Sequence, residues 1–534
     1  MEKKQPQPKE LEDLCDSAFM DPGWSDIRFT PESFPFARLR HTRFCHWVCL
    51  LVVMVFCLPA VPAKADRFTI IDETGSRKQV DGKLHGSGQG AVAIELPDGR
   101  IELYTQAALL ERDNSVEWQP ETPEQIARGL ADRFGPEVFR SKIDGNYVIG
   151  MVLMDPLERS AETAADGFLR KAARFMNQVD DIFEDFATSA RLTIHDAEVP
   201  LVLLIFESDS DFNSYATTVM KGQGLSVNRI SGFYDGLTNY LSIRMAECAT
   251  FEVPLHEAIH QQVYNRGILQ RLAPVPAWFN EGIATGFEAN KDRIRSGPIQ
   301  VHSRFATRVA DIQNLNWDVL ISDDEAFRGD VLAGDAYCLA WCLHWLLVNE
   351  HRDAYRSYVE LLSKKEPLAK QDPQFRAGEF VQLFGDDIPA LERQFSQALK
   401  IAMRKQRFRP EKPTPGMMVS QQNLAELEIK ATTRVDRGGV LEVQGRLRNM
   451  NPLRSLTFAV NLVTDGGTYA QWIVPNVDSE RTVPLPLQYA TRVMPGQTGQ
   501  ASSTFRVEVI SVLPTSSQAR EWTQGSPPVP LEGR

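Results

Sequence analysis

Cysteine is scarce in this chain of 534 residues, and its distribution argues against a fold held together by disulfides. The seven cysteines are Cys15, Cys45, Cys49, Cys57, Cys248, Cys338 and Cys342. Cys338 and Cys342 are one helical turn apart, which is a poor geometry for a disulfide bond. We therefore expect this pair to be small apolar packing residues, with a zinc site that also uses His344 as the weaker alternative.

Positive charge is also in short supply, because 58 lysines and arginines stand against 70 acidic residues and give a formal net charge of −12. This balance argues against nucleic acid or an anionic membrane surface as the main partner. The sequence has neither sustained internal repeats nor a phosphate-binding glycine loop. A hydrophobic content of 43% and a charged content of 24% are those of a globular protein, and the length predicts roughly two to four domains.

Long hydrophobic runs are lacking too, and the apolar run at residues 47–61 is about 15 residues long, where a membrane-spanning helix needs about 20. Three arginines precede this run and Ala63-Lys64-Ala65 follows it, which is the order of a secretory signal with cleavage after Ala65. Residues 1–65 are therefore predicted to be a polar leader and signal peptide, and we expect export to the periplasm, the cell surface or the medium. Without cleavage, residues 47–61 would anchor the protein to a membrane.

A His-Glu-x-x-His motif is formed by His256, Glu257 and His260. Residues four apart lie on one face of a helix, so both imidazoles can reach a single ion. Glu257 follows the first histidine, which places its carboxylate beside the metal, where it can take a proton from a metal-bound water. By chance alone, about one chain in a hundred of this length and composition would contain the motif. The alternative is therefore an amphipathic helix with two histidines hydrogen-bonded in a core.

A hydrolytic zinc site needs three protein ligands and one open position, so the two histidines require a third partner. Glu281 is the best candidate, because it lies on a second predicted helix that begins near Pro276. Gly282, next to it, would let this helix come close to the first one. Asn265, Asn280 and Glu288 are near enough in sequence to orient the ligands from behind.

Residues 255–267 and 276–288 together resemble the gluzincin metallopeptidases. More narrowly, they are similar to a poorly characterised peptidase-MA-like family of exported bacterial proteins. The resemblance implies zinc ligands at His256, His260 and Glu281 and a general base at Glu257. It extends more loosely over about residues 140–400 and leaves both ends of the chain uncovered.

Residues 334–347 are hydrophobic nearly all round and predict a buried helix that packs on the two metal-bearing ones. The resemblance implies that Tyr337, near its start, donates a hydrogen bond to the oxyanion that develops when water attacks a carbonyl. A core tyrosine with a satisfied hydroxyl is the alternative. His344 is expected to be a packed histidine.

The predicted fold class is α+β, with a gluzincin-type catalytic domain at residues 114–405 made of a sheet, the motif helix and a helical subdomain. A small β-rich module precedes it at residues 66–113. A proline-rich linker at residues 406–419 leads to a β-sandwich at residues 420–513 and a disordered tail at residues 514–534.

Inside the catalytic domain, strands are predicted at residues 147–154, 200–206 and 239–244, a long amphipathic helix at residues 160–190 and a turn at residues 232–236. The resemblance implies that residues 239–244 form one wall of the cleft, where an extended peptide adds its backbone to the sheet edge.

The function that these observations predict is that of an exported zinc metallopeptidase, with Zn²⁺ as cofactor and a peptide or protein as substrate. Two alternatives stay open. One is a non-catalytic surface module that keeps the fold, although such a module has no use for Glu257. The other is a zinc amidase that acts on a non-protein amide.

Overall fold

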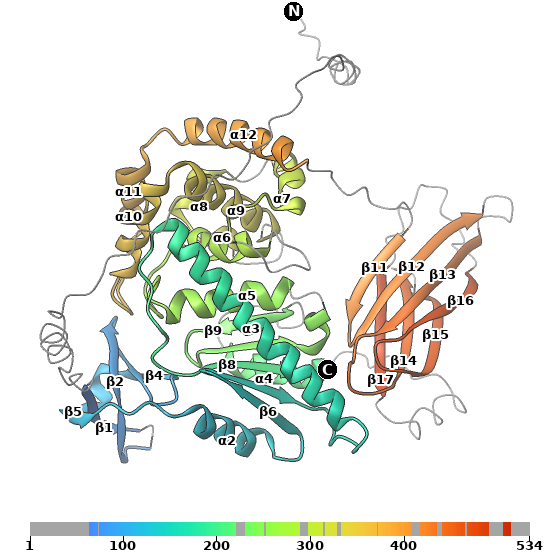
Figure 1. Ribbon diagram of the computed structural model, residues 1–534, viewed down its shortest axis with the longest axis horizontal. Coiled ribbons are helices and arrows are strands. Elements are labelled where there is room, and N and C mark those ends of the chain that lie inside the picture. The colour runs from blue at the N-terminus through green and yellow to red at the C-terminus, as the bar shows by residue number, and fades with distance from the viewer. Residues whose placement is uncertain are drawn as a thin grey trace, which may run out of the picture. The chain divides into compact units, whose positions relative to one another are not determined.

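The computed structural model describes residues 64–513, except residues 73, 221–229, 250–251, 289–296, 313–315, 328–332, 371, 408–416, 435–439, 465–466 and 491–505. The described residues form an α+β fold with the helices α2 to α12 and four sheets (Figure 1). The apolar run at residues 47–61 and the tail at residues 514–534 lie outside this range. Within it, no helix is both long enough and apolar enough to cross a bilayer.

The N-terminal module is a five-stranded sheet with the order β4-β3-β2-β1-β5. Its strands are β1 (Lys64–Ile71), β2 (Arg77–Gly88), β3 (Ala91–Glu95), β4 (Ile101–Thr105) and β5 (Leu109–Glu117). Phe68, Ile70 and Ile94 fill its small core. The predicted β-rich module is therefore present but reaches two to four residues further at each end. The expected cleavage point after Ala65 falls inside β1, where Ala65 pairs with Val116.

The central sheet of the next domain has the order β6-β7-β8-β10-β9. Its strands are β6 (Phe139–Asp144), β7 (Tyr147–Val152), β8 (Leu201–Phe206), β10 (Tyr240–Arg244) and β9 (Gly232–Asp235). β7, β8 and β10 run parallel, while β6 and β9 are antiparallel to their neighbours. All the residues of β7, β8 and β10 are buried, which explains why β7 and β8 appear in the sequence as continuous apolar runs.

The edge of this sheet was predicted wrongly. Within residues 239–244, Tyr240–Arg244 form β10, which lies between β8 and β9 and is therefore an inner strand. The edge strand is β9, which the sequence predicts as a turn. Gly232 and Gly236 bracket only three other residues, so the local composition is that of a turn. Pairing with β10 makes the segment a strand.

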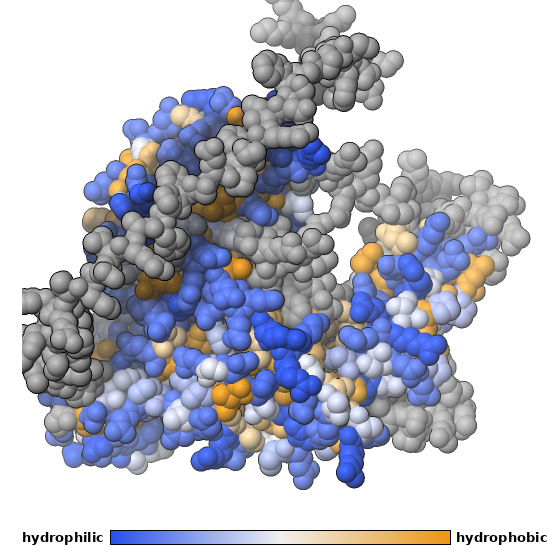
Figure 2. Space-filling view, in the orientation of Figure 1, coloured by the Kyte–Doolittle hydropathy of each residue, from blue (hydrophilic) through white to orange (hydrophobic). Residues whose placement is uncertain are grey.

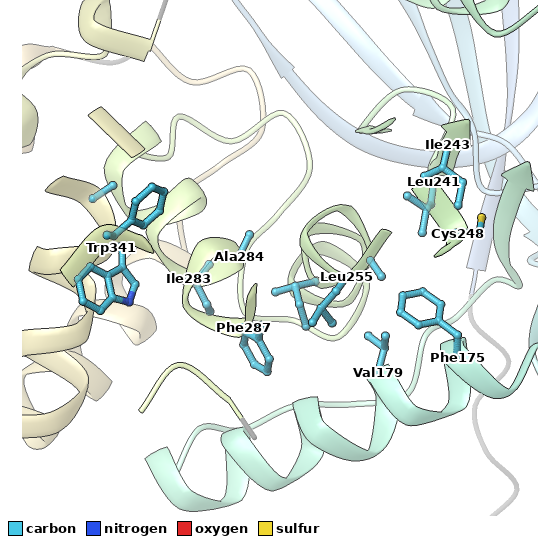
Figure 3. Close-up of a cluster of buried hydrophobic side chains, with 14 of the residues drawn as sticks. Phe175, Val179, Leu241, Ile243, Cys248, Leu255, Ile283, Ala284, Phe287 and Trp341 are labelled. Atoms are coloured by element: carbon cyan, nitrogen blue, oxygen red, sulfur yellow. The ribbon is translucent and has the colours of Figure 1, made fainter. Parts of the chain in front are cut away.

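Helices cover both faces of the central sheet, and alternate strand residues pack on opposite sides. α2 (Pro123–Phe134) and α4 (Asp209–Val219) share one apolar cluster with Val202, Leu204 and Phe206 of β8. α3 (Glu162–Ala190) and α5 (Glu252–Asn265) share the other cluster with Leu203 and Ile205. Figure 3 shows this second side, where Phe175 and Val179 of α3 and Leu241 and Ile243 of β10 lie around Leu255 of α5.

The helical subdomain that follows contains α6 (Ala277–Glu288), α7 (Ser303–Arg308), α8 (Trp317–Ser322), α9 (Ala333–Glu350), α10 (Arg352–Ser363), α11 (Pro373–Phe384) and α12 (Ile388–Lys405). α9 is the buried helix predicted around residues 334–347, and Trp341 is wholly inaccessible. Cys338 and Cys342 are also wholly buried and unbridged, as expected for packing residues. His344 is packed too, with its Nε2 2.9 Å from the Tyr355 hydroxyl.

The C-terminal domain consists of a four-stranded sheet, β11-β12-β13-β16, and a three-stranded sheet, β15-β14-β17. Its strands are β11 (Met417–Gln422), β12 (Ala425–Arg434), β13 (Val440–Asn449), β14 (Leu456–Thr464), β15 (Gly467–Val477), β16 (Thr482–Ala490) and β17 (Arg506–Leu513). Both sheets contribute side chains to one core, among them Ile429, Leu447 and Phe458. The predicted linker at residues 406–419 ends too late, because β11 begins at Met417. Figure 2 shows mostly hydrophilic residues on the visible face, with hydrophobic ones in small groups.

Candidate metal centre

Helix α5 carries both histidines of the motif next to its core residues. Leu255, Ala258, Ile259 and Val263 are wholly buried in the apolar cluster. The Nε2 atoms of His256 and His260 lie 3.1 Å apart. Both residues are more than nine-tenths buried, at 8% and 6% exposure. The helical spacing of the motif therefore does bring the two imidazoles to one point.

Helix α6 brings the predicted third ligand to the same point. Glu281 Oε2 lies 3.1 Å from His256 Nε2 and 3.5 Å from His260 Nε2. One donor atom from each of these three residues lies within 4.8 Å of the other two. The three side chains therefore form a possible metal-binding triad.

The hydrogen bond at Nδ1 of His256 supports a cation in this position. His256 Nδ1 is 2.5 Å from Glu288 Oε1, so this nitrogen carries the proton and donates to the carboxylate. In the neutral ring, Nε2 keeps its lone pair, which faces His260 Nε2 and the Glu281 carboxylate. Such a set of two imidazole nitrogens and one carboxylate oxygen is the ligand set of a catalytic zinc site. The residues present thus fit a zinc ion.

The close approach of two helices fixes the position of Glu281. A Cβ atom on Gly282 would lie 2.8 Å from the Ala340 carbonyl oxygen and 3.0 Å from His344 Cβ, so α6 meets α9 at this residue. The glycine was expected to allow contact with the motif helix, but its nearest neighbours are in α9. At the start of α6, the Ala277 amide donates to Asp324 Oδ1 over 2.8 Å.

The predicted general base is held by the sheet edge. Glu257 Oε2 accepts a hydrogen bond of 2.8 Å from the backbone amide of Tyr234 in β9. Burial raises the pKa of Glu257, while the charges of His256 and His260 oppose this shift. The carboxylate therefore stands beside the triad, and its orientation is set by a strand that the sequence did not reveal.

Of the three residues predicted to support the ligands, Glu288 does so most directly. Burial opposes its ionisation, but the hydrogen bond from His256 and the nearby imidazole of His302 lower the pKa of Glu288 to about 2. Asn280 Nδ2 donates to Glu281 Oε1 over 3.2 Å. Asn265 lies away from the ligands, since it bonds the side chain of Asn239.

The charges in the triad depend on one another. Burial lowers the affinity of His256 for a proton, but its hydrogen bonds to Glu281 and Glu288 raise the pKa of His256 well above its usual value. Burial likewise opposes ionisation of Glu281, yet the charge of His260 and the hydrogen bond from His256 lower the pKa of Glu281 well below its usual range. The metal-free site thus favours an ionised carboxylate next to a protonated imidazole, and a cation can replace that proton.

Two tyrosines flank the triad from different helices. The ring of Tyr337 in α9 is 6.1 Å from that of His256, and its hydroxyl lies near the Glu281 carboxylate. The negative charge of Glu281 and burial raise the pKa of Tyr337, so it stays a donor. Tyr337 is thus in the site, in contact with a ligand.

The second tyrosine, Tyr264, was missed in the sequence. It lies one turn after His260 and stacks on Tyr234 with 5.7 Å between the ring centres. No group in the described part of the chain hydrogen-bonds its hydroxyl. Tyr264 also lines a polar cavity of about 400 Å³ that reaches to His85 and Gln270. The signal for it was its spacing of four residues from His260 on one helix.

Comparison with known proteins covers this site only in part. No curated protein is similar to the chain. A family model described as "Protein of unknown function (DUF1570)" matches residues 249–369, which include the motif, Glu281 and Tyr337. Over this segment, the chain is similar to a family whose description assigns no activity.

Proposed function

We propose that this protein is a zinc-dependent metallopeptidase that hydrolyses peptide bonds. One observation carries the proposal: two imidazoles and a carboxylate from separate helices converge, while a second carboxylate, Glu257, stands beside them and is held by the sheet edge. A structural zinc site would be closed by a fourth ligand and would need no such base. Glu257 therefore favours a catalytic site over a structural one.

The chemistry follows from the placement of these groups. A zinc ion held by His256, His260 and Glu281 would lower the pKa of a coordinated water toward ~7 and polarise the scissile carbonyl. Glu257 accepts the proton of the attacking water and passes it to the leaving amine. Burial, which raises the pKa of Glu257, suits this exchange near neutral pH.

The two tyrosines can bond the substrate carbonyl as it becomes tetrahedral. The Tyr337 hydroxyl lies near the Glu281 carboxylate, whose charge keeps it protonated. The Tyr264 hydroxyl has no hydrogen bond within the described residues, and stacking on Tyr234 holds its ring. We therefore assign substrate contact to both residues.

The edge strand supports an extended peptide as substrate. Tyr234 pairs with Leu241 of β10 in the sheet, yet its amide points to Glu257 on the other side. The free edge of β9 therefore faces the base. A peptide that added to this edge would pass in front of Glu257 and the metal ligands. β9 therefore replaces residues 239–244 as the proposed strand to which a peptide substrate adds.

We keep export as part of the proposal, on the basis of the apolar run at residues 47–61 and the small residues after it. The amidase alternative and the non-catalytic alternative predict different outcomes in the same assay. Neither would cleave peptides, and only the amidase would act on non-protein amides.

The test compares the wild-type protein with Glu257→Gln, and uses Glu124→Gln in α2 as the matched control for loss of a carboxylate. Bound zinc and cleavage of a diverse peptide library are measured with and without a chelator. We expect Glu257→Gln to keep its zinc and to lose at least ~100-fold in cleavage rate. Cleavage that survives this substitution would remove the general-base role. Zinc binding by the wild type without cleavage of any peptide would contradict the peptidase assignment.

A further inference from the structure

His302 is a buried histidine that lies behind the metal ligands and has no role in the mechanism above. It precedes α7, and its Nδ1 accepts a hydrogen bond from the Phe305 amide over 3.4 Å. An accepting Nδ1 carries no proton, so the proton of the neutral ring is on Nε2. That Nε2 lies 3.7 Å from Glu288 Oε2. The ring therefore directs an N–H group at the carboxylate that supports His256.

Packing holds the ring of His302 in this orientation. It stacks on Phe305 with 4.3 Å between ring centres and 19° between planes. Trp341 of α9 lies against it at 5.9 Å and 63°. Histidine is not one of the usual residues before a helix, where Ser, Thr, Asp and Asn provide the side-chain acceptor. A second use for the ring, at Nε2, explains its presence there.

The two oxygens of Glu288 contact two different histidines. Oε1 contacts His256 Nδ1 at 2.5 Å, and Oε2 faces His302 Nε2. Glu288 lies seven residues, or about two turns, after Glu281 on the same helix. α6 thus supplies the ligand Glu281 and supports the ligand His256 through Glu288. The two histidines hold the carboxylate of Glu288 from both sides.

We propose that His302 is a positioning residue of the metal centre, which acts through Glu288 to hold the Nδ1-protonated form and the ring orientation of His256. The proposal rests on the proposed function only in requiring that the triad binds a metal. The contacts from His302 to Glu288 and from Glu288 to His256 connect α7, α6 and α5. The start of α7 supplies no metal ligand but contributes to the metal affinity through these contacts.

Two substitutions separate this role from a purely structural one. In His302→Asn, the amide oxygen takes the place of Nδ1 and keeps the cap of α7, but no donor reaches Glu288. In His302→Gln, the amide nitrogen takes the place of Nε2 and can donate to Glu288, but the cap is lost. Both remove the stacked ring equally. His351→Gln is the control, because His351 also precedes a helix, has no capping bond and contacts Gln394.

The experiment measures Zn²⁺ affinity by chelator competition, the visible spectrum of the Co²⁺-loaded protein and the melting temperature of the metal-free protein. We expect His302→Asn to lower zinc affinity about tenfold and change the Co²⁺ spectrum, with a melting temperature close to that of the wild type. His302→Gln should melt earlier yet bind zinc within about twofold of the wild type. Glu288→Gln should lose about 10- to 100-fold.

Three outcomes would overturn the proposal. Equal zinc affinity of His302→Asn and the wild type would show that the Nε2–H group does not support the site. Affinities that follow the melting temperatures would show a structural role only. A wild-type protein that binds no metal would contradict the proposed function and this inference together, whereas the first two outcomes leave the proposed function intact.

Discussion

Replacement of Gly282 by alanine tests whether the contact between α6 and α9 positions the ligand Glu281. A methyl group there would lie 2.8 Å from the Ala340 carbonyl oxygen, which belongs to the backbone and cannot rotate away. Ordinary contacts between such atoms need about 3.5 Å, so α6 would have to move by roughly 0.7 Å. Glu281 is the adjacent residue and would move with it.

The expected magnitude is the balance of two opposing effects. Alanine in place of glycine within a helix stabilises a protein by about 0.5–1 kcal/mol. An added methyl group in a filled site destabilises it by about 1–3 kcal/mol. Gly378, in the middle of α11, has no atom within 4 Å of an added Cβ, so Gly378→Ala has the first effect alone. Gly282→Ala should therefore be less stable than Gly378→Ala by about 1–3 kcal/mol.

The assay is urea unfolding of both metal-free variants together with zinc affinity by chelator competition. Metal–ligand distances tolerate errors of only about 0.2 Å, so Gly282→Ala should also bind zinc about tenfold more weakly, while Gly378→Ala should bind normally. If Gly282→Ala is as stable as Gly378→Ala and binds zinc like the wild type, the helix contact does not position the ligand.

Three further predictions concern single side chains. His260→Ala should leave the purified protein with little zinc, and unchanged zinc content would refute its role as a ligand. Tyr264→Phe should lower kcat/KM for peptides about 10- to 100-fold with unchanged zinc content, and unchanged kinetics would exclude substrate contact. Burial lowers the pKa of His344 to about 3, so the folded protein takes up this proton later than the unfolded chain as the pH falls. Relative to His344→Gln, the wild type should lose about 1.4 kcal/mol of unfolding free energy between pH 7.5 and 5.5, and parallel pH profiles would contradict this.

Local signals were enough for the ligand set and for several helices. The spacing of His256 and His260 determines which helix face they share, so their convergence follows from α-helix geometry. α2 begins where Thr122 and Gln125 form reciprocal caps, a signal that is local in the sequence. The apolar stripe predicted at residues 160–190 is α3, which begins at Glu162.

Contacts between distant segments could not be obtained from the sequence. β9 is a strand because it pairs with β10, and its own four residues resemble a turn. Glu288 supports a ligand and Asn265 does not, because only the packing of α6 against α5 brings Glu288 to His256, and no local pattern in the sequence records that packing. His302 follows Glu288 by 14 residues, and only the fold brings its ring behind the site.

The most direct test of the account is a zinc count on the full-length protein and on Glu281→Ala. Both proteins are stripped with a chelator, reloaded with zinc, dialysed and analysed by plasma mass spectrometry. The triad predicts about one zinc ion per wild-type chain and a large loss in Glu281→Ala. Full zinc occupancy in Glu281→Ala, or none in the wild type, would contradict a metal centre built from these three residues.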